Sequence, residues 1–328
     1  VTALCYREPA GWWFVWTMLA AGIFGAAAML FSRPSSKTIY AKDGLVTVAL
    51  SWILLSLVGA LPFTLSGEIP FYLDAVFEMI SGFTTTGSSI LPDVEALSRC
   101  MLMWRSFSHW LGGMGILVFM MAIVRLEGGQ GIHLLRAESP GPTVGKMVPR
   151  MVDSSKILYS IYFALTLIQI AFYLAGGMPL FDTLCNAFGT AGTGGFAIKG
   201  ASLGAYDYYA QTVTTVFMIL FGVNFSIYFF LLRKKFDLAF KNTELRWYLI
   251  IIFASIAAIT VNIVPQFPSV YDALHHAAFA VGSVITTTGY CTVDFNLWPE
   301  LSRVILVFLM LIGACAGSTG GGLKVSRA

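Results

Sequence analysis

Long apolar segments without charged side chains are the feature that most constrains this 328-residue chain. The residues from Trp12 to Phe31 include no Asp, Glu, Lys or Arg. The hydrocarbon core of a bilayer, about 30 Å thick, needs about 20 such residues in a helix. Only 11% of the whole chain is charged, against roughly a quarter in soluble domains. The sequence therefore predicts an all-α membrane protein.

Six further segments predict membrane helices, at 44–65, 106–124, 157–176, 208–232, 247–264 and 303–317. The last is short for a complete span. If the chain starts outside and its first helix runs inward, the inner segments carry 15 of the 20 Lys and Arg residues. Cytoplasmic loops of membrane proteins are enriched in these cations. We therefore expect the inner side to hold 32–43, 125–156, 233–246 and the C-terminal residues.

On the outer side, a short helix and a polar loop follow a span three times, and another span follows each loop. The short helices are predicted from YLDAVFEMISGF, LFDTLCNAFGTA and VYDALHHAAFAV. Each contains an Asp where a helix N-cap is expected, at the positive end of the helix dipole; these are Asp74, Asp182 and Asp272. The third copy has about one extra helical turn before its loop.

Each short helix leads into a loop rich in Thr and Gly: TTTGSS, TAGTGGF or TTTGYCT. Non-helical backbone at membrane depth is tolerated only where it is buried in protein or lines a wet path. Extended backbone with glycine can direct successive carbonyl oxygens at one axis, where they replace the hydration shell of potassium. The alternative is three ordinary extracellular turns. Because the context recurs three times, we interpret the loops as a re-entrant ion filter.

The final apolar segment contains GACAGSTGGGLK, residues 313–324. It differs from a phosphate-binding loop, Gly-x4-Gly-Lys-Ser/Thr, because Leu323 separates Gly322 from Lys324 and Val325 follows. We interpret it as a break in a membrane helix that forms a gate below the filter. The alternative is the frayed cytoplasmic end of a helix.

A few polar side chains in apolar surroundings have structural interpretations. We expect Glu78 and Arg105 to form an ion pair, and His109 to be a packed or interfacial side chain. Because His275 and His276 are adjacent, they cannot share a helix face.

The sequence shows no pattern typical of an enzyme. Paired carboxylates, a Ser/His/Asp set and metal-ligand spacings are all missing. Small glycines in HWLGGMGI, at 112, 113 and 115, favour close contact between helices. The cysteines form no Cys-x-x-Cys pair, and we interpret them as small apolar packing residues; they are Cys5, Cys100, Cys185, Cys291 and Cys315.

Taken together, these motifs resemble the Trk/Ktr/HKT superfamily of potassium transporters, and within it the bacterial Trk-type pore-forming subunit. The two TTTG loops, TAGTGGF, HWLGGMGI, RAESPGP with KMVPR, and GACAGSTGGGLK follow the family's order across nearly the whole chain. The resemblance implies helix–pore-loop–helix repeats in a pseudo-fourfold arrangement around one ion pore, preceded by two extra helices.

On that pattern the chain divides into six parts: 1–43, a leading helix and inner loop; 44–124, the first pore repeat; 125–156, a cytoplasmic connection; 157–232, the second repeat; 233–246, a cytoplasmic loop; and 247–328, the third repeat, truncated in its second helix. The family's fourth repeat and first leading helix have no match here, so we expect a longer native polypeptide.

The resemblance also implies the functional residues. It implies filter glycines at Gly87, Gly194 and Gly289. Glycine rather than serine at position 87 implies a preference for potassium over sodium. The residues that precede these glycines lend carbonyl groups, and they are Thr85, Thr86, Gly192, Thr193, Thr287 and Thr288. The implied gating loop comprises Gly313, Ala314, Gly317, Ser318, Thr319, Gly320, Gly321, Gly322 and Lys324.

The resemblance further implies a homodimer with one pore in each protomer, contact with membrane lipid, and a cytosolic nucleotide-binding regulatory ring. We expect potassium uptake across the bacterial cytoplasmic membrane, with the potassium ion as substrate, no cofactor and no nucleic-acid partner. Two alternatives remain: a sodium- or proton-coupled cation carrier with broken helices, and a membrane scaffold that conducts nothing.

Overall fold

The computed structural model describes residues 1–31, 41–115 and 151–328. Within these ranges the chain folds into helices joined by turns and short 3-10 segments, without strands, so the all-α prediction is confirmed. The motifs RAESPGP and KMVPR lie outside the described residues, as does the end of the predicted span 106–124.

The leading part holds α1 (Thr2–Tyr6) and α2 (Gly11–Phe31). The first repeat holds α3 (Ala41–Ser66), α4 (Tyr72–Phe83) and α5 (Arg99–Gly113). The second holds α8 (Met151–Ala175), α9 (Leu180–Ala191), α10 (Tyr208–Phe221) and α11 (Phe225–Leu232). After α12 (Phe236–Phe240), the third holds α13 (Thr243–Ile263), α14 (Val270–Ile285) and α15 (Glu300–Ile312). Short 3-10 segments lie at Val94–Ala96, Ser202–Ala205, Val264–Gln266 and Phe295–Leu297.

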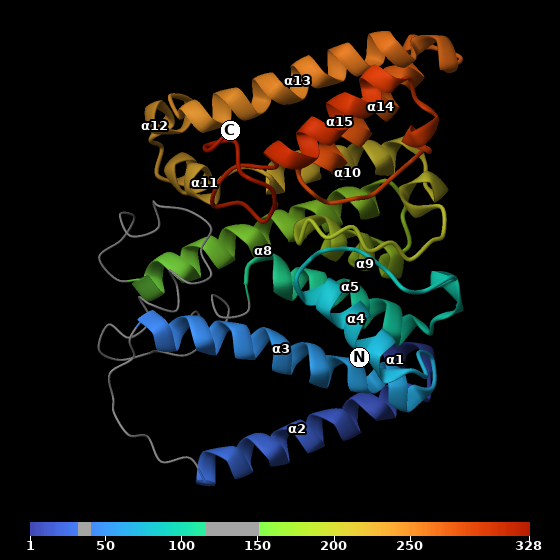
Figure 1. Cartoon of the computed structure of the whole chain (residues 1–328), viewed down its shortest axis with the longest axis vertical. Coiled ribbons are helices and arrows are strands. Elements are labelled where there is room, and N and C mark those ends of the chain that lie inside the picture. The colour runs from blue at the N-terminus through green and yellow to red at the C-terminus, as the bar shows by residue number, and fades with distance from the viewer. Residues whose placement is uncertain (32–40, 116–150) are drawn as a thin grey trace.

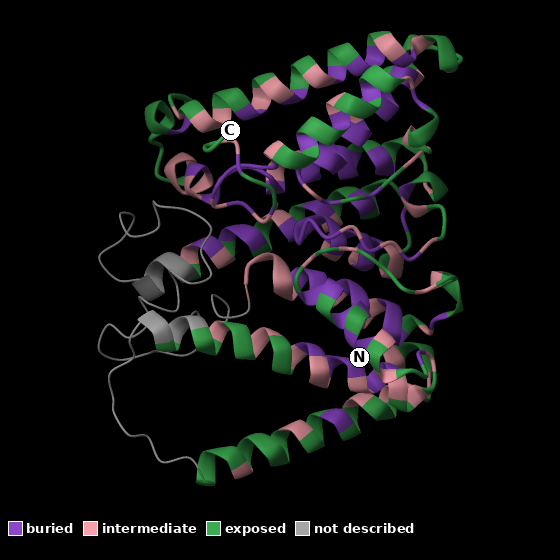
Figure 2. Ribbon diagram, viewed as in Figure 1, coloured by how far each residue is buried: buried purple, intermediate pink, exposed green. Residues whose placement is uncertain are grey.

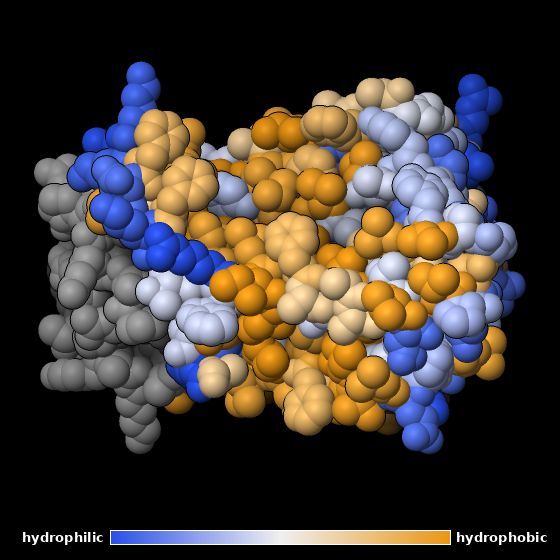
Figure 3. All heavy atoms as spheres, turned by 90° about the horizontal axis from the view of Figure 1, so that it is seen from above, coloured by the Kyte–Doolittle hydropathy of each residue, from blue (hydrophilic) through white to orange (hydrophobic). Residues whose placement is uncertain are grey.

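Four described helices are long and apolar enough to cross a membrane: Gly11–Phe31, Val46–Ser66, Lys156–Ala175 and Thr243–Gln266. Seen from above, hydrophobic side chains form a broad central belt with hydrophilic side chains at both ends (Figure 3). The starts of α3 and α8 and the pair α11–α12 lie on the same side of the molecule, left in Figure 1. This side carries 233–246, the one basic loop assigned to the inner face that lies wholly within the described residues.

The predicted span 208–232 is not one continuous helix, because the chain bends by 89° between α10 and α11. Gly222 ends α10, and Asn224 caps α11 by accepting a hydrogen bond from the Ser226 amide at 2.9 Å. Glycine after a helix and asparagine before the next are the residues that favour such a stop and restart. The predicted span 303–317 likewise ends early, at Ile312.

The three short helices are α4, α9 and α14. Asp74, Asp182 and Asp272 lie in their first turns rather than at the N-caps, which are Phe71, Pro179 and Ser269; the N-cap prediction is therefore wrong. A carboxylate in the first turn still complements the positive end of the helix. The predicted extra turn is confirmed, since α14 has 16 residues and α4 and α9 have 12 each.

Ser269 and Asp272 form a reciprocal cap at the start of α14. The Ser269 hydroxyl accepts a hydrogen bond from the Asp272 amide at 3.1 Å and donates to its carboxylate at 2.7 Å. Hydrogen bonds from Ser269 and Tyr208 lower the pKa of the Asp272 carboxyl, so the cap keeps its charge at neutral pH.

The short helices are mostly buried (Figure 2). α4 also keeps exposed apolar side chains, at Phe77 and Ile80. Each repeat has its own apolar core. Neighbouring repeats meet where α5 packs against α9 and α10 packs against α14. α9 and α14 therefore each lie between the spans of their own repeat and the second span of the preceding one, whereas α4 packs against α3 and α5 of its own repeat. This packing brings the three Thr/Gly loops together.

The cysteine interpretation holds for three positions only. Cys100, Cys185 and Cys315 are buried, whereas Cys5 and Cys291 are exposed.

Candidate ion filter and gating loop

The three Thr/Gly loops repeat one backbone conformation. Two positions in each loop have positive φ: the second after the short helix, always threonine, and the fourth, always glycine. The threonines are Thr85, Thr193 and Thr287, with φ of 55°, 51° and 57°, and the glycines are Gly87, Gly195 and Gly289, with φ of 76°, 75° and 88°. A β-branched residue with positive φ is strained by about 1–3 kcal/mol. The same strain at three matching positions indicates a functional constraint.

The amide of the third position points back to its own short helix. Thr86 N donates to Ser81 O at 2.9 Å, Gly194 N to Gly189 O at 3.0 Å, and Thr288 N to Ser283 O at 2.8 Å. Among the described residues, no hydrogen bond reaches the carbonyl oxygens of the second and third positions, which are those of Thr85, Thr86, Thr193, Gly194, Thr287 and Thr288. Thr193, Gly194 and Thr288 are buried. Since buried carbonyls normally have a partner, oxygens left without one are available to a ligand.

The structure corrects the register of the second loop by one residue. Gly195, not Gly194, has the conformation of Gly87 and Gly289. The reason is that α9 ends at Ala191, so Gly192 occupies the first loop position and Gly194 the third. Gly194 thus corresponds in position to Thr86 and Thr288, not to the terminal glycines.

His109 explains why the second loop has glycine at positions one and three. A Cβ atom at Gly192 would overlap the His109 carbonyl, and one at Gly194 would overlap the His109 ring. The ring is fully buried, as expected for a packed histidine, and stacks on Phe196 with centroids 4.0 Å apart. In the other two loops these positions are threonines whose hydroxyls hydrogen-bond to each other, at 2.8 Å in the first and 2.7 Å in the third.

The loops contact one another through their terminal glycines. A Cβ atom at Gly87 would overlap the carbonyl oxygen of Gly194, and one at Gly195 would overlap that of Thr288. A Cβ atom at Gly289 would meet nothing within 4 Å. The loops therefore form an arc in which Gly87 and Gly195 each lie against the third-position carbonyl of the following loop, and Gly289 lies at the open end.

A buried ion pair fixes the segments that follow the first two loops, as predicted for Glu78 and Arg105. Arg105 Nε donates to Glu78, and the two side chains are 3% and 0% exposed. Glu78 also accepts hydrogen bonds from the Ser89 hydroxyl at 3.0 Å and the Ile90 amide at 3.1 Å. Arg105 donates to the Ala197 carbonyl at 3.0 Å. Removing one partner of such a pair destabilises the protein strongly, because the other charge stays buried without a counter-charge.

Tyr290, which sequence reasoning missed, connects the second and third repeats. It directly follows Gly289, and its hydroxyl lies 3.3 Å from the carbonyl oxygens of Asn186 and Phe196. Its own carbonyl accepts a hydrogen bond from Ser283 at 2.6 Å. The sequence signal that could have identified Tyr290 is the aromatic residue directly after the TTTG motif.

His275 and His276 also hold elements around the third loop. His275 Nε2 lies 2.7 Å from the Gln211 side-chain oxygen on α10, and His276 Nδ1 lies 2.9 Å from the Thr292 hydroxyl. They take different partners, as expected from their different faces. Among the described residues, no group of three His, Cys, Asp or Glu side chains could hold a metal ion. The candidate cation ligands at the loops are therefore backbone and hydroxyl oxygens.

Two of the second spans end beside the Thr/Gly loops, since Gly112 and Gly113 lie close to Thr85 and Gly192 and Gly222 lies close to Thr286. α5 ends at Gly113, α10 at Phe221 and α15 at Ile312. A Cβ atom at Gly112 would overlap the Phe83 carbonyl, and one at Gly113 would lie too close to Gly192. These two glycines allow the close contact predicted for HWLGGMGI, whereas Gly115 lies beyond the helix end.

The candidate gating loop follows α15 and lies against the third filter loop. Gly313 has a φ of 72° and ends the helix. The Gly321 amide donates to the Thr287 hydroxyl at 2.7 Å, and the Thr319 hydroxyl donates to the Phe221 carbonyl at 3.2 Å. The Lys324 ammonium donates to the Gly320 carbonyl within the loop.

The break between α10 and α11 and the start of α13 hold this loop in place. Cys315 N donates to Gly222 O at 3.0 Å, and Phe225 N donates to Gly317 O at 2.9 Å. The Ala316 amide donates to the Glu244 carboxylate at 2.6 Å. These contacts, with Ala314 and Cys315 fully buried, do not fit the frayed helix end of the alternative reading.

Comparisons with known proteins agree with this arrangement. A family model described as a cation transport protein, TrkH, matches residues 13–328. The Trk system potassium uptake protein TrkH of Vibrio parahaemolyticus is 36% identical over 338 residues, covering 100% of this chain and 69% of that protein. TrkG of Escherichia coli K12 is 34% identical over 339 residues, covering 100% and 68%. The crystal structure of the potassium transporter TrkH from Vibrio parahaemolyticus matches with a TM-score of 0.85 and 33% identity, covering 99% of this chain and 68% of that one.

The matching family model spans almost the whole chain, and the relatives exceed 30% identity over more than two thirds of their own length. The chain therefore belongs to the TrkH family of cation transport proteins.

Proposed function

We propose that this protein takes up potassium across the bacterial cytoplasmic membrane through a filter built from the three Thr/Gly loops. One observation carries the proposal: three loops share two strained positions and leave the same pair of carbonyl oxygens without a hydrogen bond. Backbone carbonyls of this kind replace the hydration shell of potassium. The relatives named as potassium uptake proteins support the same substrate.

The short helices add to the attraction for a cation. α4, α9 and α14 each end at a filter loop, so the partly negative ends of their dipoles point at the loops. Inward movement follows the membrane potential, which contributes about 2.3 kcal/mol per charge for each 100 mV.

The loop 313–324 is the gate of this path. It lies against the third filter loop through Gly321 and Thr287, and against the break in the α10–α11 span through Gly317 and Phe225. Displacement of the loop requires these bonds and the Glu244 bond to Ala316 to open together. In the open state of the gate, these hydrogen bonds are broken.

We also propose a homodimer, each protomer with its own pore, and a cytosolic nucleotide-binding ring that acts on the gate. The relatives are named as parts of a Trk system, which supports a multicomponent assembly. Size measurement of the purified protein, with and without such a ring, tests both points.

The test of the function is potassium against sodium flux into proteoliposomes that contain the full-length protein. We expect potassium flux to exceed sodium flux without any imposed proton gradient. Potassium flux that requires a sodium or proton gradient favours the coupled carrier. No flux from folded protein, with the cytosolic ring added, favours the scaffold.

A further inference from the structure

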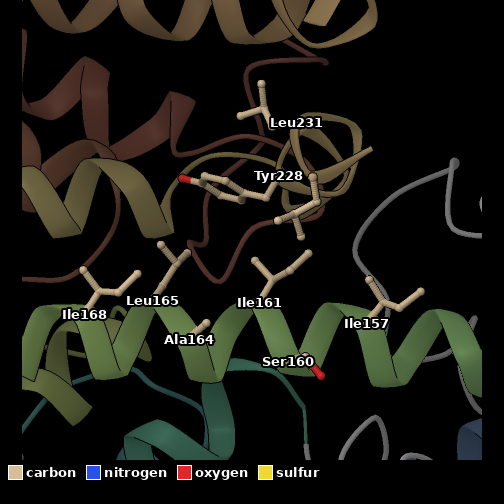
Figure 4. A pocket seen from close by; sticks show the side chains of 9 residues that line it. Ile157, Ser160, Ile161, Ala164, Leu165, Ile168, Tyr228 and Leu231 are labelled. Carbon is tan, nitrogen blue, oxygen red and sulfur yellow. The ribbon is translucent and has the colours of Figure 1, made fainter. Parts of the chain in front are cut away.

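An apolar groove of about 660 Å³ lies between α8 and α11, away from the filter. Figure 4 shows side chains of α8 along one side of the groove and those of α11 on the other. The lining includes Ile157, Ile161, Ala164 and Leu165 of α8 and Tyr228 and Leu231 of α11.

The polar atoms near the groove are satisfied within the protein. The Ser160 hydroxyl donates to the Lys156 carbonyl of its own helix at 2.7 Å, and the Tyr228 hydroxyl donates to Leu220 O at 2.7 Å. The lining therefore offers contact to hydrocarbon and no free hydrogen-bonding group. α8 is a candidate membrane span over Lys156–Ala175, so the groove lies at the depth of lipid acyl chains.

Four cations flank the inner end of this groove. Lys156 directly precedes Ile157 on α8, and Arg233, Lys234 and Lys235 directly follow Leu232 at the end of α11. All four side chains are exposed. Within the described part of the chain, none of them forms an ion pair. Cations at this depth attract the anionic headgroups of the cytoplasmic leaflet.

We propose that the groove binds a phospholipid with an anionic headgroup. One acyl chain lies along α8 against Leu165 and Leu231, and the phosphate lies among Lys156, Arg233, Lys234 and Lys235. A second copy of the chain is the competing occupant. A symmetric contact centred on the groove would bring two sets of these four cations together, and like charges in contact are repelled.

The bound lipid also acts on the gate, a consequence that rests on the proposed function. Tyr228 lines the groove and bonds to the end of α10 across the break. Phe225, three residues earlier on α11, donates to Gly317 of the gating loop at 2.9 Å. An acyl chain packed against Tyr228 therefore supports the bent arrangement that holds the loop.

Native mass spectrometry of the full-length protein in neutral detergent tests binding with phosphatidylglycerol and phosphatidylcholine as probes. Two variants address the two halves of the site: a quadruple change of Lys156, Arg233, Lys234 and Lys235 to Gln, and Ala164→Phe, which fills the groove. Lys241→Gln is the matched control, since it removes an inner-side cation that does not flank the groove.

We expect one retained phosphatidylglycerol per chain, in preference to phosphatidylcholine. Each test variant is expected to weaken retention at least about tenfold, while Lys241→Gln leaves it unchanged. Equal retention of the two lipids, or full retention by Ala164→Phe, overturns the proposal. Loss of dimer in Ala164→Phe without loss of lipid assigns the groove to a second copy and also overturns it.

Because this assay needs no ion flux, it separates lipid binding from the proposed function. Potassium flux in vesicles with and without phosphatidylglycerol then tests the effect on the gate. A lipid-dependent flux that disappears in Ala164→Phe supports that effect. Flux that is equal in both vesicle types overturns it while leaving the binding result intact.

Discussion

Gly289 allows the filter to be perturbed at a known energetic cost. It has a φ of 88°, and an added Cβ atom would meet nothing within 4 Å. The cost of Gly289→Ala is therefore that of a left-handed backbone for an L-residue, about 1–2 kcal/mol. Strain of 1.4 kcal/mol changes a conformational equilibrium tenfold. If the filter loop relaxes to relieve it, the preference for potassium over sodium falls by up to roughly tenfold.

The chain offers a matched control at Gly177, between α8 and α9. Its φ is 81°, and an added Cβ atom there would also meet nothing within 4 Å. Gly177→Ala carries the same strain outside the filter loops. Both variants are expected to lower the apparent melting temperature in detergent by a similar amount. Only Gly289→Ala is expected to change the ratio of potassium to sodium flux. Equal ratios in the two variants would refute the assignment of the loop.

Three further predictions concern the filter and its supports. The double change Gly87→Ser with Gly289→Ser is expected to weaken discrimination against sodium, because a side chain at position 87 displaces the Gly194 carbonyl; unchanged ion preference in paired flux assays contradicts it. Glu78→Gln leaves Arg105 buried without its counter-charge, a loss of about 3–5 kcal/mol that thermal unfolding in detergent measures. A melting temperature equal to that of the unchanged protein shows that the pair is dispensable. Glu244→Ala removes a charged acceptor worth about 1.5–3 kcal/mol from the gating loop and is expected to raise basal potassium flux without changing selectivity; Asp237→Ala, at an exposed inner-side site, is the control.

Much of the fold follows from apolar length and local capping chemistry. The long spans could be predicted because lipid requires about 20 apolar residues in a helix. The short helices could be predicted because their apolar runs end in Thr and Gly. The same signals locate the bend between α10 and α11, since Gly222 and Asn224 are typical helix-ending and helix-starting residues. The prediction missed this bend because the strong apolar character of 208–232 favoured one continuous span.

The details of the filter depend on contacts between distant parts of the chain, and sequence patterns do not reveal these. TAGTGGF contains two adjacent glycines, and local conformational preference does not decide which of them takes the fourth loop position. The choice is made by the end of α9 and by His109, which comes from α5 and occupies the space beside Gly192 and Gly194. The bond from Ala316 to Glu244 likewise joins residues 72 positions apart.

The position of the bound ion is the measurement that tests the central claim most directly. Crystals of the full-length protein grown in rubidium, a heavier analogue of potassium, give an anomalous signal at each bound ion. We expect peaks on one axis within coordination distance of the carbonyl oxygens of Thr86, Gly194 and Thr288. Peaks only at acidic side chains, or none near the three loops in well-ordered crystals, would contradict it.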